Sequence, residues 1–494
     1  MKKLIKITSI LAILLGFAAC SDSYFDVNTP ADAVDIDQLD MKDLMGPVLY
    51  NTMMAQYSTT NVFGNYSQYF GGYGNAAAGK TDLAGAWNYI YLYVLPNVRI
   101  IKEKAASQDA KYYEAVAMVI EAANIGLATD NWDAVPYSQA SEPSEFAHPD
   151  FDSQEQIYSE IFSLLNQAIQ LLEGADNSFI GMGNEDLIYK GDFSKWLRAA
   201  YTLKARYQLH LVQKGLSSPN DVLASIANGF ESNSDNFIMS FPDDKLNPWY
   251  QNAILTRSTG NYYVAPNDQI ISMMNGTTYP FESDAIEIDP RLPEIYQNEG
   301  ADGSPWRGAM NGGDGSSSDG EPSNTFYKDG GYFTNATAPL ILISYAEAMF
   351  IKAEAGFLAN GGTTTSTGSN SETYSAYMLG IDASMGQYGV DGTGYMADGA
   401  VAVGEDGLML NHIMKEKYIA NTLNSETYND FRRYDFSANV FKGLALRLEL
   451  DDSDSDYKGQ WFRRAIYPVS ERNANPDVVA KYEQEPTVNV WWAD

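Results

Sequence analysis

Apolar residues recur at helical spacing through the first half of the chain. Between 153 and 174 they fall at i, i+4, i+7, i+8, i+11 and i+15, which predicts one buried stripe of a helix that starts after Ser153 and ends near Gly174. The same criteria predict further helices over 84–107, 111–128, 192–213, 339–359 and 408–424. Helices of this length joined by short loops favour a mainly α fold built as an α-solenoid of tetratricopeptide type, although no regular sequence repeat is found.

The middle of the chain, 229–335, has a different character. Pro, Gly, Asn, Asp and Ser cluster there, as in GADGSPWRGAMNGGDGSSSDGEPSN, so long irregular loops are expected rather than helices. Loops held on a rigid scaffold commonly carry binding surfaces. We therefore expect a loop-rich ligand-binding face with few short strands, supported by the helix pairs.

The N-terminus has the pattern of a secretion signal. A basic MKK start precedes a mostly apolar stretch from Leu4 to Ala19, which is shorter than the roughly 20 apolar residues that a spanning helix needs. The only cysteine of the chain, Cys20, follows directly, so neither an intrachain disulfide nor a thiolate zinc cluster can form. Residues 21–40 are polar, acidic and proline-containing, as expected of a tether.

The composition excludes some partners. The chain carries 64 Asp and Glu against 32 Lys and Arg, a formal net charge of −32, yet it is 13% aromatic, which argues for a folded protein with an acidic surface. A field of that sign repels phosphate backbones, so nucleic-acid binding is not expected.

Several segments together resemble the SusD/RagB family of outer-membrane nutrient-binding lipoproteins, in its SusD-like branch. The first is Phe17-Ala18-Ala19-Cys20, which is similar to a lipoprotein cleavage box with Phe17 in the place of the usual Leu. In chain order the others are TDNW with VPYSQA at 129–140, KWLRAAYTLKARYQLHL at 195–211, DPRL at 289–292, ISYAEAMFIKAEA at 343–355, KEKYIANTLNSETYNDFRRYD at 415–435, Arg463-Arg464 with Tyr467-Pro468, and Val490-Trp491-Trp492.

The resemblance implies the organisation of the chain. Residues 1–19 would be a signal peptide, 20–40 a tether lipidated at Cys20, and 41–494 a single domain. That domain would divide into a helical part (41–228), a loop-rich ligand face (229–338) and a C-terminal helical and irregular part (339–494).

The resemblance also implies a function. The protein would be anchored at the cell surface in the outer membrane, where it would capture an oligosaccharide without catalysis and deliver it to a SusC-type TonB-dependent transporter. Two alternatives stay open: a peptide ligand, as in the RagB branch, and a lipid-anchored hydrolase.

Aromatic residues in polar loops are the candidate ligand contacts. Sugar C–H groups pack on aromatic planes, whereas sugar hydroxyls need Asp, Asn or Arg partners. For each candidate the alternative is packing of the loop onto the core. The candidates are Tyr66, Tyr69, Tyr73, Trp249, Tyr250, Tyr262, Tyr263 and Trp306. Two other aromatic residues are expected to have structural roles. Trp87 is expected in the core, and Trp132 is expected in a structural loop motif.

Charged residues raise two further questions. Glu347 lies on the otherwise apolar helix 339–359, so burial would require a cationic partner, for which Arg432 or Arg433 is the candidate. The run Asp452, Asp454 and Asp456 has the alternating oxygen ligands of a calcium loop but lacks its glycine and bidentate glutamate, so no metal site is expected beyond a nonstandard Ca²⁺ site.

Signatures of catalysis are missing from the sequence. It contains no G-x-S-x-G elbow, P-loop or H-E-x-x-H motif, and its three histidines, His148, His210 and His412, are far apart. A glycosidase needs only two suitably spaced carboxylates, so this observation alone leaves a hydrolase open.

Overall fold

The computed structural model describes residues 39–71, 79–140, 142, 145–242, 244–260, 264–312, 315–446 and 457–494. The predictions for Cys20, for Tyr73, Tyr262 and Tyr263 and for the acidic run 452–456 lie outside these residues.

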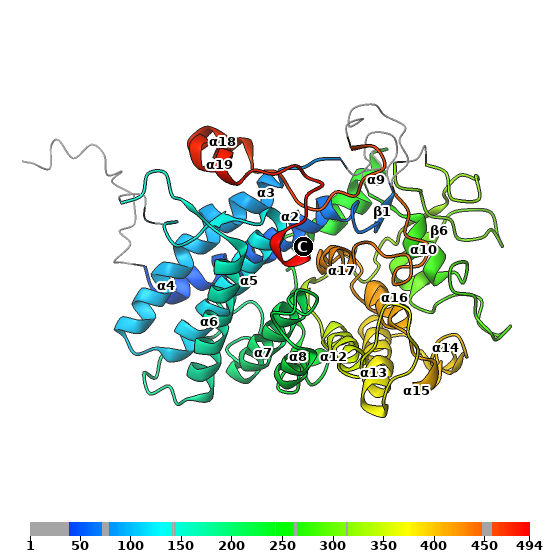
Figure 1. Ribbon diagram of the computed structural model, residues 1–494, viewed down its shortest axis with the longest axis horizontal. Helices are drawn as coiled ribbons and strands as arrows, with labels where there is room; N and C mark the ends of the chain where they lie inside the picture. Colours follow the sequence, from blue (N-terminus) through cyan, green and yellow to red (C-terminus); the bar gives the residue numbers. More distant parts are fainter. Residues whose placement is uncertain are drawn as a thin grey trace, which may run out of the picture.

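The fold is mainly α-helical, which confirms the predicted class (Figure 1). The helices are α2 (Met41–Phe63), α3 (Ala84–Asn88), α4 (Leu95–Ser107), α5 (Lys111–Trp132), α6 (Gln154–Glu173), α7 (Phe193–His210), α8 (Pro219–Ile226), α9 (Thr256–Ser258), α10 (Asp268–Met274), α11 (Leu292–Ile295), α12 (Tyr345–Ala359), α13 (Ser371–Tyr388), α14 (Thr393–Ala397), α15 (Gly404–Gly407), α16 (Leu410–Ala420), α17 (Glu426–Arg433), α18 (Val469–Ala474) and α19 (Pro476–Tyr482). The π-helical segments η4 (Tyr89–Val94) and η6 (Tyr250–Leu255) and the 3-10 turns η5 (Asn233–Asp235) and η8 (Trp491–Ala493) complete the described helical elements.

Short strands pair in antiparallel twos within the described residues. The pairs are β1 (Phe70–Gly71) with β5 (Ala265–Pro266), β2 (Val135–Pro136) with β3 (Phe151–Asp152), β4 (Phe237–Met239) with β8 (Leu340–Ile343), and β6 (Tyr296–Asn298) with β7 (Thr325–Tyr327). Each pair holds a loop against the helices, and none of the pairs forms a separate sheet layer.

The long helices stand in a row in which each packs against the next. The row runs α4, α5, α6, α7, α8, α12 and α13, from blue through green to yellow in Figure 1. Helix α6 shows why: Ser153 caps it with a capping box, and its predicted apolar stripe from Ile157 to Leu172 is buried. The solenoid-like arrangement is therefore a direct consequence of helical periodicity.

Two predicted helices differ in detail. The stretch 84–107 is helical throughout but widens to π geometry at Tyr89–Val94, immediately before Pro96, which lacks the N–H that would bond the Leu92 carbonyl. The stretch 339–359 is wrong at its start. Residues Leu340–Ile343 are strand β8, and the helix begins only after the N-cap Ser344.

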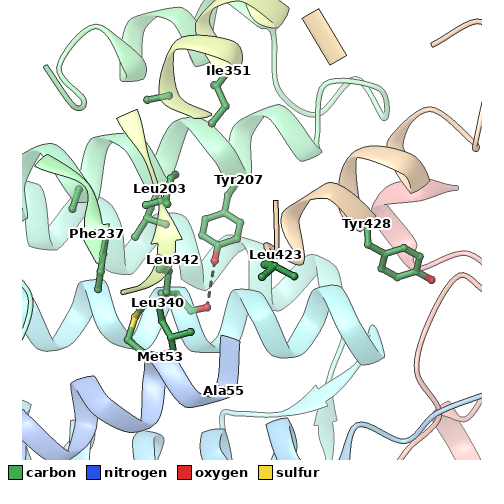
Figure 2. Packing of buried hydrophobic residues seen from close by; sticks show 14 of the residues in the cluster. Met53, Ala55, Leu203, Tyr207, Phe237, Leu340, Leu342, Ile351, Leu423 and Tyr428 are labelled. Carbon is green, nitrogen blue, oxygen red and sulfur yellow. Dashed lines mark hydrogen bonds between the residues drawn. The ribbon is translucent and has the colours of Figure 1, made fainter. Parts of the chain in front are cut away.

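The strand β8 explains this correction. Its leucines lie beside Met53 of α2 and Leu203 of α7 (Figure 2), and its backbone pairs with β4. Tertiary pairing therefore decides the conformation of an apolar run that helix and strand could both accommodate.

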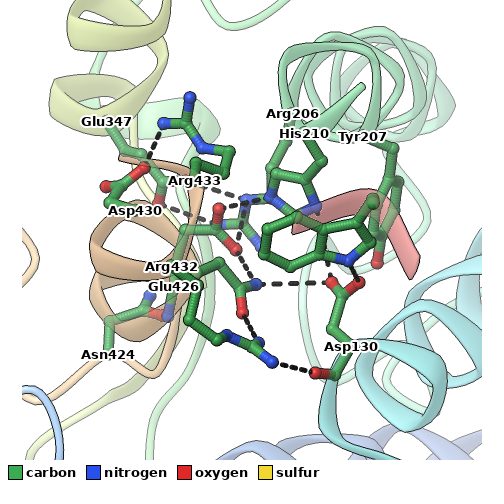
Figure 3. Close-up of polar contacts among 12 residues, drawn as sticks. Asp130, Arg206, Tyr207, His210, Glu347, Asn424, Glu426, Asp430, Arg432 and Arg433 are labelled. Carbon is green, nitrogen blue, oxygen red and sulfur yellow. Dashed lines mark hydrogen bonds and ion pairs between the residues drawn. The ribbon is translucent and has the colours of Figure 1, made fainter. Parts of the chain in front are cut away.

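Glu347 is fully buried, but its partner is not the predicted one. The guanidinium of Arg206 on α7 donates to both of its oxygens, at 2.8 and 2.7 Å (Figure 3). Arg433 instead donates to both oxygens of Glu354, at 2.6 and 3.1 Å, and Arg432 donates to the backbone carbonyl of Asp130 at 2.7 Å. The prediction of Arg432 or Arg433 is wrong because Arg433 of α17 contacts α12 about two turns further along, at Glu354.

A second buried chain of contacts ties the C-terminus to the frame. His210 Nε2 lies 2.6 Å from Glu426, and Asp130 accepts hydrogen bonds from the Tyr158 hydroxyl at 2.7 Å and from the Trp492 indole at 2.8 Å. Helices α5, α6, α7 and α17 and the last residues of the chain therefore meet at one polar layer.

A third buried cluster fixes the loop before α11. Arg291 donates to Asp289 and to Glu416, both at 2.6 Å, and Glu416 also accepts from Tyr395 at 2.6 Å. Burial alone would raise the pKa of Glu416, but Lys415 and Arg291 outweigh it and lower the pKa to about 2. Glu416 is therefore held as a carboxylate in the interior.

We expect Glu347→Gln to lower the free energy of unfolding by about 3 kcal/mol, because Arg206 would stay buried with Glu426 as a more distant counter-charge, 3.8 Å away. Urea unfolding of the purified protein measures this. The matched control is Glu103→Gln, which breaks an exposed pair with Arg99 at 2.9 Å and should cost about 0.5 kcal/mol or less. Equal effects of the two variants would contradict the role of the buried pair.

His412 should make stability depend on pH. Its Nδ1 accepts the N–H of Met409 at 3.2 Å, and burial, followed by the charges of Lys442 and Lys415, lowers its pKa from 6.5 to about 4. Between these values the unfolded chain binds a proton that the folded chain excludes. Stability should therefore fall as the pH drops from 6.5, by up to about 3 kcal/mol at pH 4.

Thermal unfolding between pH 7 and pH 4.5 measures this slope. His412→Gln, which can keep the acceptor at this helix position, should flatten it, whereas His148→Gln, a change at an exposed histidine, should leave it unchanged. A slope that survives His412→Gln would show that other groups cause it.

Candidate functional site

Three adjoining hollows form a groove on the loop-rich side of the molecule. The first, of about 20 Å³, and the second, of about 270 Å³, share Asn311 and Leu446, while the second and the third, of about 510 Å³, share Thr277. We call these three hollows together the groove. The combined space is of the size that small-molecule sites typically have.

Trp306 lines the third hollow, and its loop is held by amide side chains. Asn275 donates to the Trp306 carbonyl at 2.9 Å, and Asn298 of β6 donates to the Ser304 carbonyl at 2.8 Å. The turn between them needs Gly303, whose φ of +75° strains other residues. The indole is half-buried, with the carboxylates of Glu287 and Asp302 in the same hollow.

Amide side chains and Asp268 line the second hollow. Gln269 donates to the Lys442 carbonyl at 2.9 Å, and the Ser317 hydroxyl donates to Asp268 at 2.7 Å. Asn311 donates to the Asn65 carbonyl at 3.1 Å, which leaves its Oδ1 pointing away from that bond. This buried oxygen has no hydrogen-bond partner among the described residues, although Asn311 is only 8% exposed.

The first hollow has aromatic walls. Trp461 stacks on Phe436 with the ring centroids 4.5 Å apart and the planes 4° from parallel, and Tyr66 stacks on Phe462 at 5.4 Å. The unpaired Oδ1 of Asn311 therefore lies between the Trp461 indole at one end of the groove and the Trp306 indole at the other.

Among the described residues, the charged side chains that line the groove are all acidic. Its described lining residues include Asp268, Glu287 and Asp302 but contain no Lys, Arg or His. An anionic ligand would meet only carboxylates there, whereas a neutral ligand with hydroxyl groups would find acceptors and ring faces.

The predicted aromatic residues divide between groove and core. Trp306 lines the groove, and Tyr66 lines its edge while packing on Phe63. Tyr69 and Trp249 are buried in the interior, as the alternative of loop packing expected. Tyr250 is half-buried at the start of η6 and is not among the residues that line the groove.

The interior positions of Tyr69 and Trp249 have simple causes. The Tyr69 hydroxyl donates to the Tyr418 carbonyl at 2.7 Å, and its ring stacks on that of Tyr418 at 4.8 Å. Trp249 packs against Tyr57 with centroids 4.7 Å apart. Neither ring offers a face to a ligand in this structure. Trp87 is buried in the core, as predicted. Trp132 is also buried, but as the last residue of helix α5 rather than in a loop.

The sequence analysis missed Trp461, Phe436 and Asn311. Trp461 stands in YKGQWF, a polar stretch with aromatic residues, so the criterion that selected Trp306 would also have selected it. Asn311 has no such signal, because its importance comes from an unpaired oxygen that only the fold reveals.

The buried His210, Glu426 and Asp130 do not form a substrate site. The cavity beside Asp130 and Glu426 is lined almost entirely by buried residues, so its volume of about 20 Å³ is an internal space for one water molecule that a substrate could not enter. The Oδ1 of Asn124, which lines this cavity, has no partner among the described residues, so a water there would complete its bonding. These ionisable groups serve the fold.

The described residues show neither a cluster of metal ligands nor a membrane-spanning helix. The described residues contain no group of three or more His, Cys, Asp or Glu side chains placed to hold a metal ion. None of the described helices combines the length and apolarity needed to cross a bilayer.

Comparisons with known proteins point in one direction. Residues 33–468 match the family model SusD-like, described as starch-binding and associating with the outer membrane. No curated protein sequence matches the chain.

Solved structures share the fold. A SusD/RagB family protein from Bacteroides thetaiotaomicron is 23% identical, with 92% of this chain and 99% of that chain aligned and a TM-score of 0.69. A chitin-binding SusD homolog from Flavobacterium johnsoniae is 20% identical, with 92% and 98% aligned and a TM-score of 0.71. A SusD homolog from Bacteroides fragilis is 18% identical, with 92% and 100% aligned and a TM-score of 0.70.

Proposed function

Because the chain belongs to the SusD-like family of starch-binding proteins that associate with the outer membrane, we propose that it captures an oligosaccharide in the groove at the cell surface. The family provides the ligand class and the association with the outer membrane. The groove provides the place on this chain.

The observation that carries the proposal is the unpaired Asn311 Oδ1, which lies between the indoles of Trp461 and Trp306. A sugar ring presents C–H groups to an aromatic face and hydroxyl donors at its edge. Trp461 and Trp306 can take the first role, and Asn311 Oδ1 and Asp268 can take the second. A chain of sugar units could then occupy the length of the groove.

The groove also favours one class of glycan. Since its described lining has carboxylates and no basic residue, uronic acids and sulfated sugars would be repelled. We therefore expect a neutral glycan. Chitin, the ligand of the Flavobacterium johnsoniae homolog, is a neutral polymer and belongs on the list of ligands to try.

Delivery to a transporter is part of the same proposal. A binding protein on the outer leaflet must hand its ligand to a channel, and a TonB-dependent transporter of the SusC type is the partner that the family resemblance implies. A gene for such a transporter beside the gene for this chain would support the proposal, and neighbouring genes for polysaccharide-degrading enzymes would further favour a glycan ligand.

Two alternatives remain for the ligand and the chemistry. A peptide would use the same aromatic walls, and a hydrolase would use two carboxylates such as Glu287 and Asp302, which line one hollow. Incubation of the purified protein with neutral polysaccharides and with peptides, with retention and product release both measured, separates the three. Product release by a homogeneous preparation would replace the binding proposal with a hydrolase.

We expect Trp306→Ala and Trp461→Ala each to weaken glycan binding about tenfold or more, because each removes a ring face worth about 1–3 kcal/mol. Isothermal titration with the retained glycan measures this. Trp491→Ala is the matched control, since Trp491 is also a half-buried tryptophan but is not among the lining residues of the groove. Unchanged affinity in both groove variants, in folded protein, would place the site elsewhere.

Lipid attachment is proposed at Cys20, the only cysteine. We expect the wild-type chain to incorporate radioactive palmitate and to sediment with membranes, because acyl chains contribute about 0.8 kcal/mol for each buried methylene. Cys20→Ser should abolish both. A labelled Cys20→Ser variant, or an unlabelled soluble wild type, would rule out the anchor.

A further inference from the structure

A second large hollow lies apart from the groove. It has a volume of about 830 Å³ and is formed by the 3-10 turn η5 with its flanking residue, the start of α12, helix α13 and helix α14. In Figure 1 helices α13 and α14 lie at the lower right, with α10 and β6 above them. It shares no lining residue with the groove, and we call it the methionine hollow.

The floor of the methionine hollow is apolar and adaptable. Three methionines, Met378, Met385 and Met396, line it together with Val390. Methionine side chains are flexible and polarizable, so they pack well on an unbranched aliphatic chain. Only one aromatic ring, that of Tyr345, lines the hollow, so it lacks the paired platforms of the groove.

Three side chains around this floor offer hydrogen-bond acceptors. Asn233 donates its amide N–H to the Ala383 carbonyl at 2.9 Å, and its Oδ1 is buried without a partner in the described chain. Asp382 of α13 and Asp391 also line the hollow, and neither forms an ion pair with any described residue. The two carboxylates favour a ligand that brings hydrogen-bond donors.

Counter-charges are missing from the hollow itself. Its described lining contains no Lys, Arg or His. The ammonium of Lys195 reaches only the Ser234 carbonyl, to which it donates at 2.6 Å. Burial raises the pKa of the Tyr345 hydroxyl, and the carboxylates of Asp382 and Asp235 raise it further.

We propose that the methionine hollow binds an alkylammonium group, an amine carried on an apolar stem of several methylenes. The stem would lie on the methionines, and the ammonium would donate to the Asp382 carboxylate, which lines the same hollow. The side chain of a lysine residue and a free aliphatic diamine share this chemistry. An anion is disfavoured by the two carboxylates, and a sugar by the single ring.

The test compares a charged probe with a neutral one of the same length. Isothermal titration with 1,5-diaminopentane should show saturable binding, and 1,5-pentanediol should bind about tenfold more weakly or not at all. Asp382→Asn should weaken diamine binding about tenfold, whereas Asp284→Asn, the same change at an exposed aspartate outside the hollow, should leave it unchanged. Equal binding of the diol, or equal loss in both variants, would overturn the proposal as general attraction to an acidic protein.

A second pair of probes distinguishes the sources of the amine. The peptide acetyl-Gly-Lys-Gly-amide is compared with the same peptide acetylated on the lysine side chain. Preference for the free lysine would identify a peptide side chain as ligand, and binding of the diamine alone would identify a free amine. Failure of both to bind would overturn the proposal. The Trp306→Ala variant should bind these probes as the wild type does, which separates this site from the groove.

Discussion

The structure depends on a few buried charged side chains that meet their counter-charges on distant elements. Helices α16 and α17 carry Glu416, Glu426 and Arg433 into the interior, where an unpaired charge would cost several kcal/mol. Each finds its counter-charge on a different element: Arg291 before α11, Arg206 on α7 and Glu354 on α12. The helices of the solenoid row are therefore fastened to the C-terminal part by ion pairs that allow one relative arrangement, in addition to the apolar contacts that fill the space between them.

The same constraint reaches the groove. The Asp289 N–H donates to the Met274 carbonyl at 2.7 Å, so the Arg291 cluster fixes the end of helix α10. Asn275, which follows this helix, holds the Trp306 carbonyl. The buried ion cluster around Glu416 of α16 therefore sets the position of the Trp306 indole. The connection runs through helix α10 and the side-chain amide of Asn275.

Sequence reasoning succeeded where one local period decides the outcome. The stripe of α6 predicted its helix and its buried face, because a single amphipathic pattern suffices. It failed where distant partners decide: Leu340–Ile343 is a strand because β4 lies beside it, and Glu347 meets Arg206 rather than Arg433 because α7 packs on the first turn of α12. Aromatic residues show the same limit. Tyr69 and Trp306 occur in similar polar loops, and only the fold places one ring under Tyr418 and leaves the other half-exposed.

The excess of acid over base does not come from the largest interior ion pairs. The interior acids Glu347, Glu354, Glu416 and Glu426 lie beside buried cations, so these pairs contribute little to the net charge of −32. The groove and the methionine hollow are both acidic, because carboxylates line each of the two sites without basic residues beside them in the described lining. Their difference lies in the apolar component. Rigid indole faces suit the flat C–H surface of a sugar, whereas flexible methionines suit an aliphatic stem. The negative charge therefore disfavours anionic ligands in both the groove and the methionine hollow. The shape of the apolar side chains favours a sugar in the groove and an aliphatic stem in the methionine hollow.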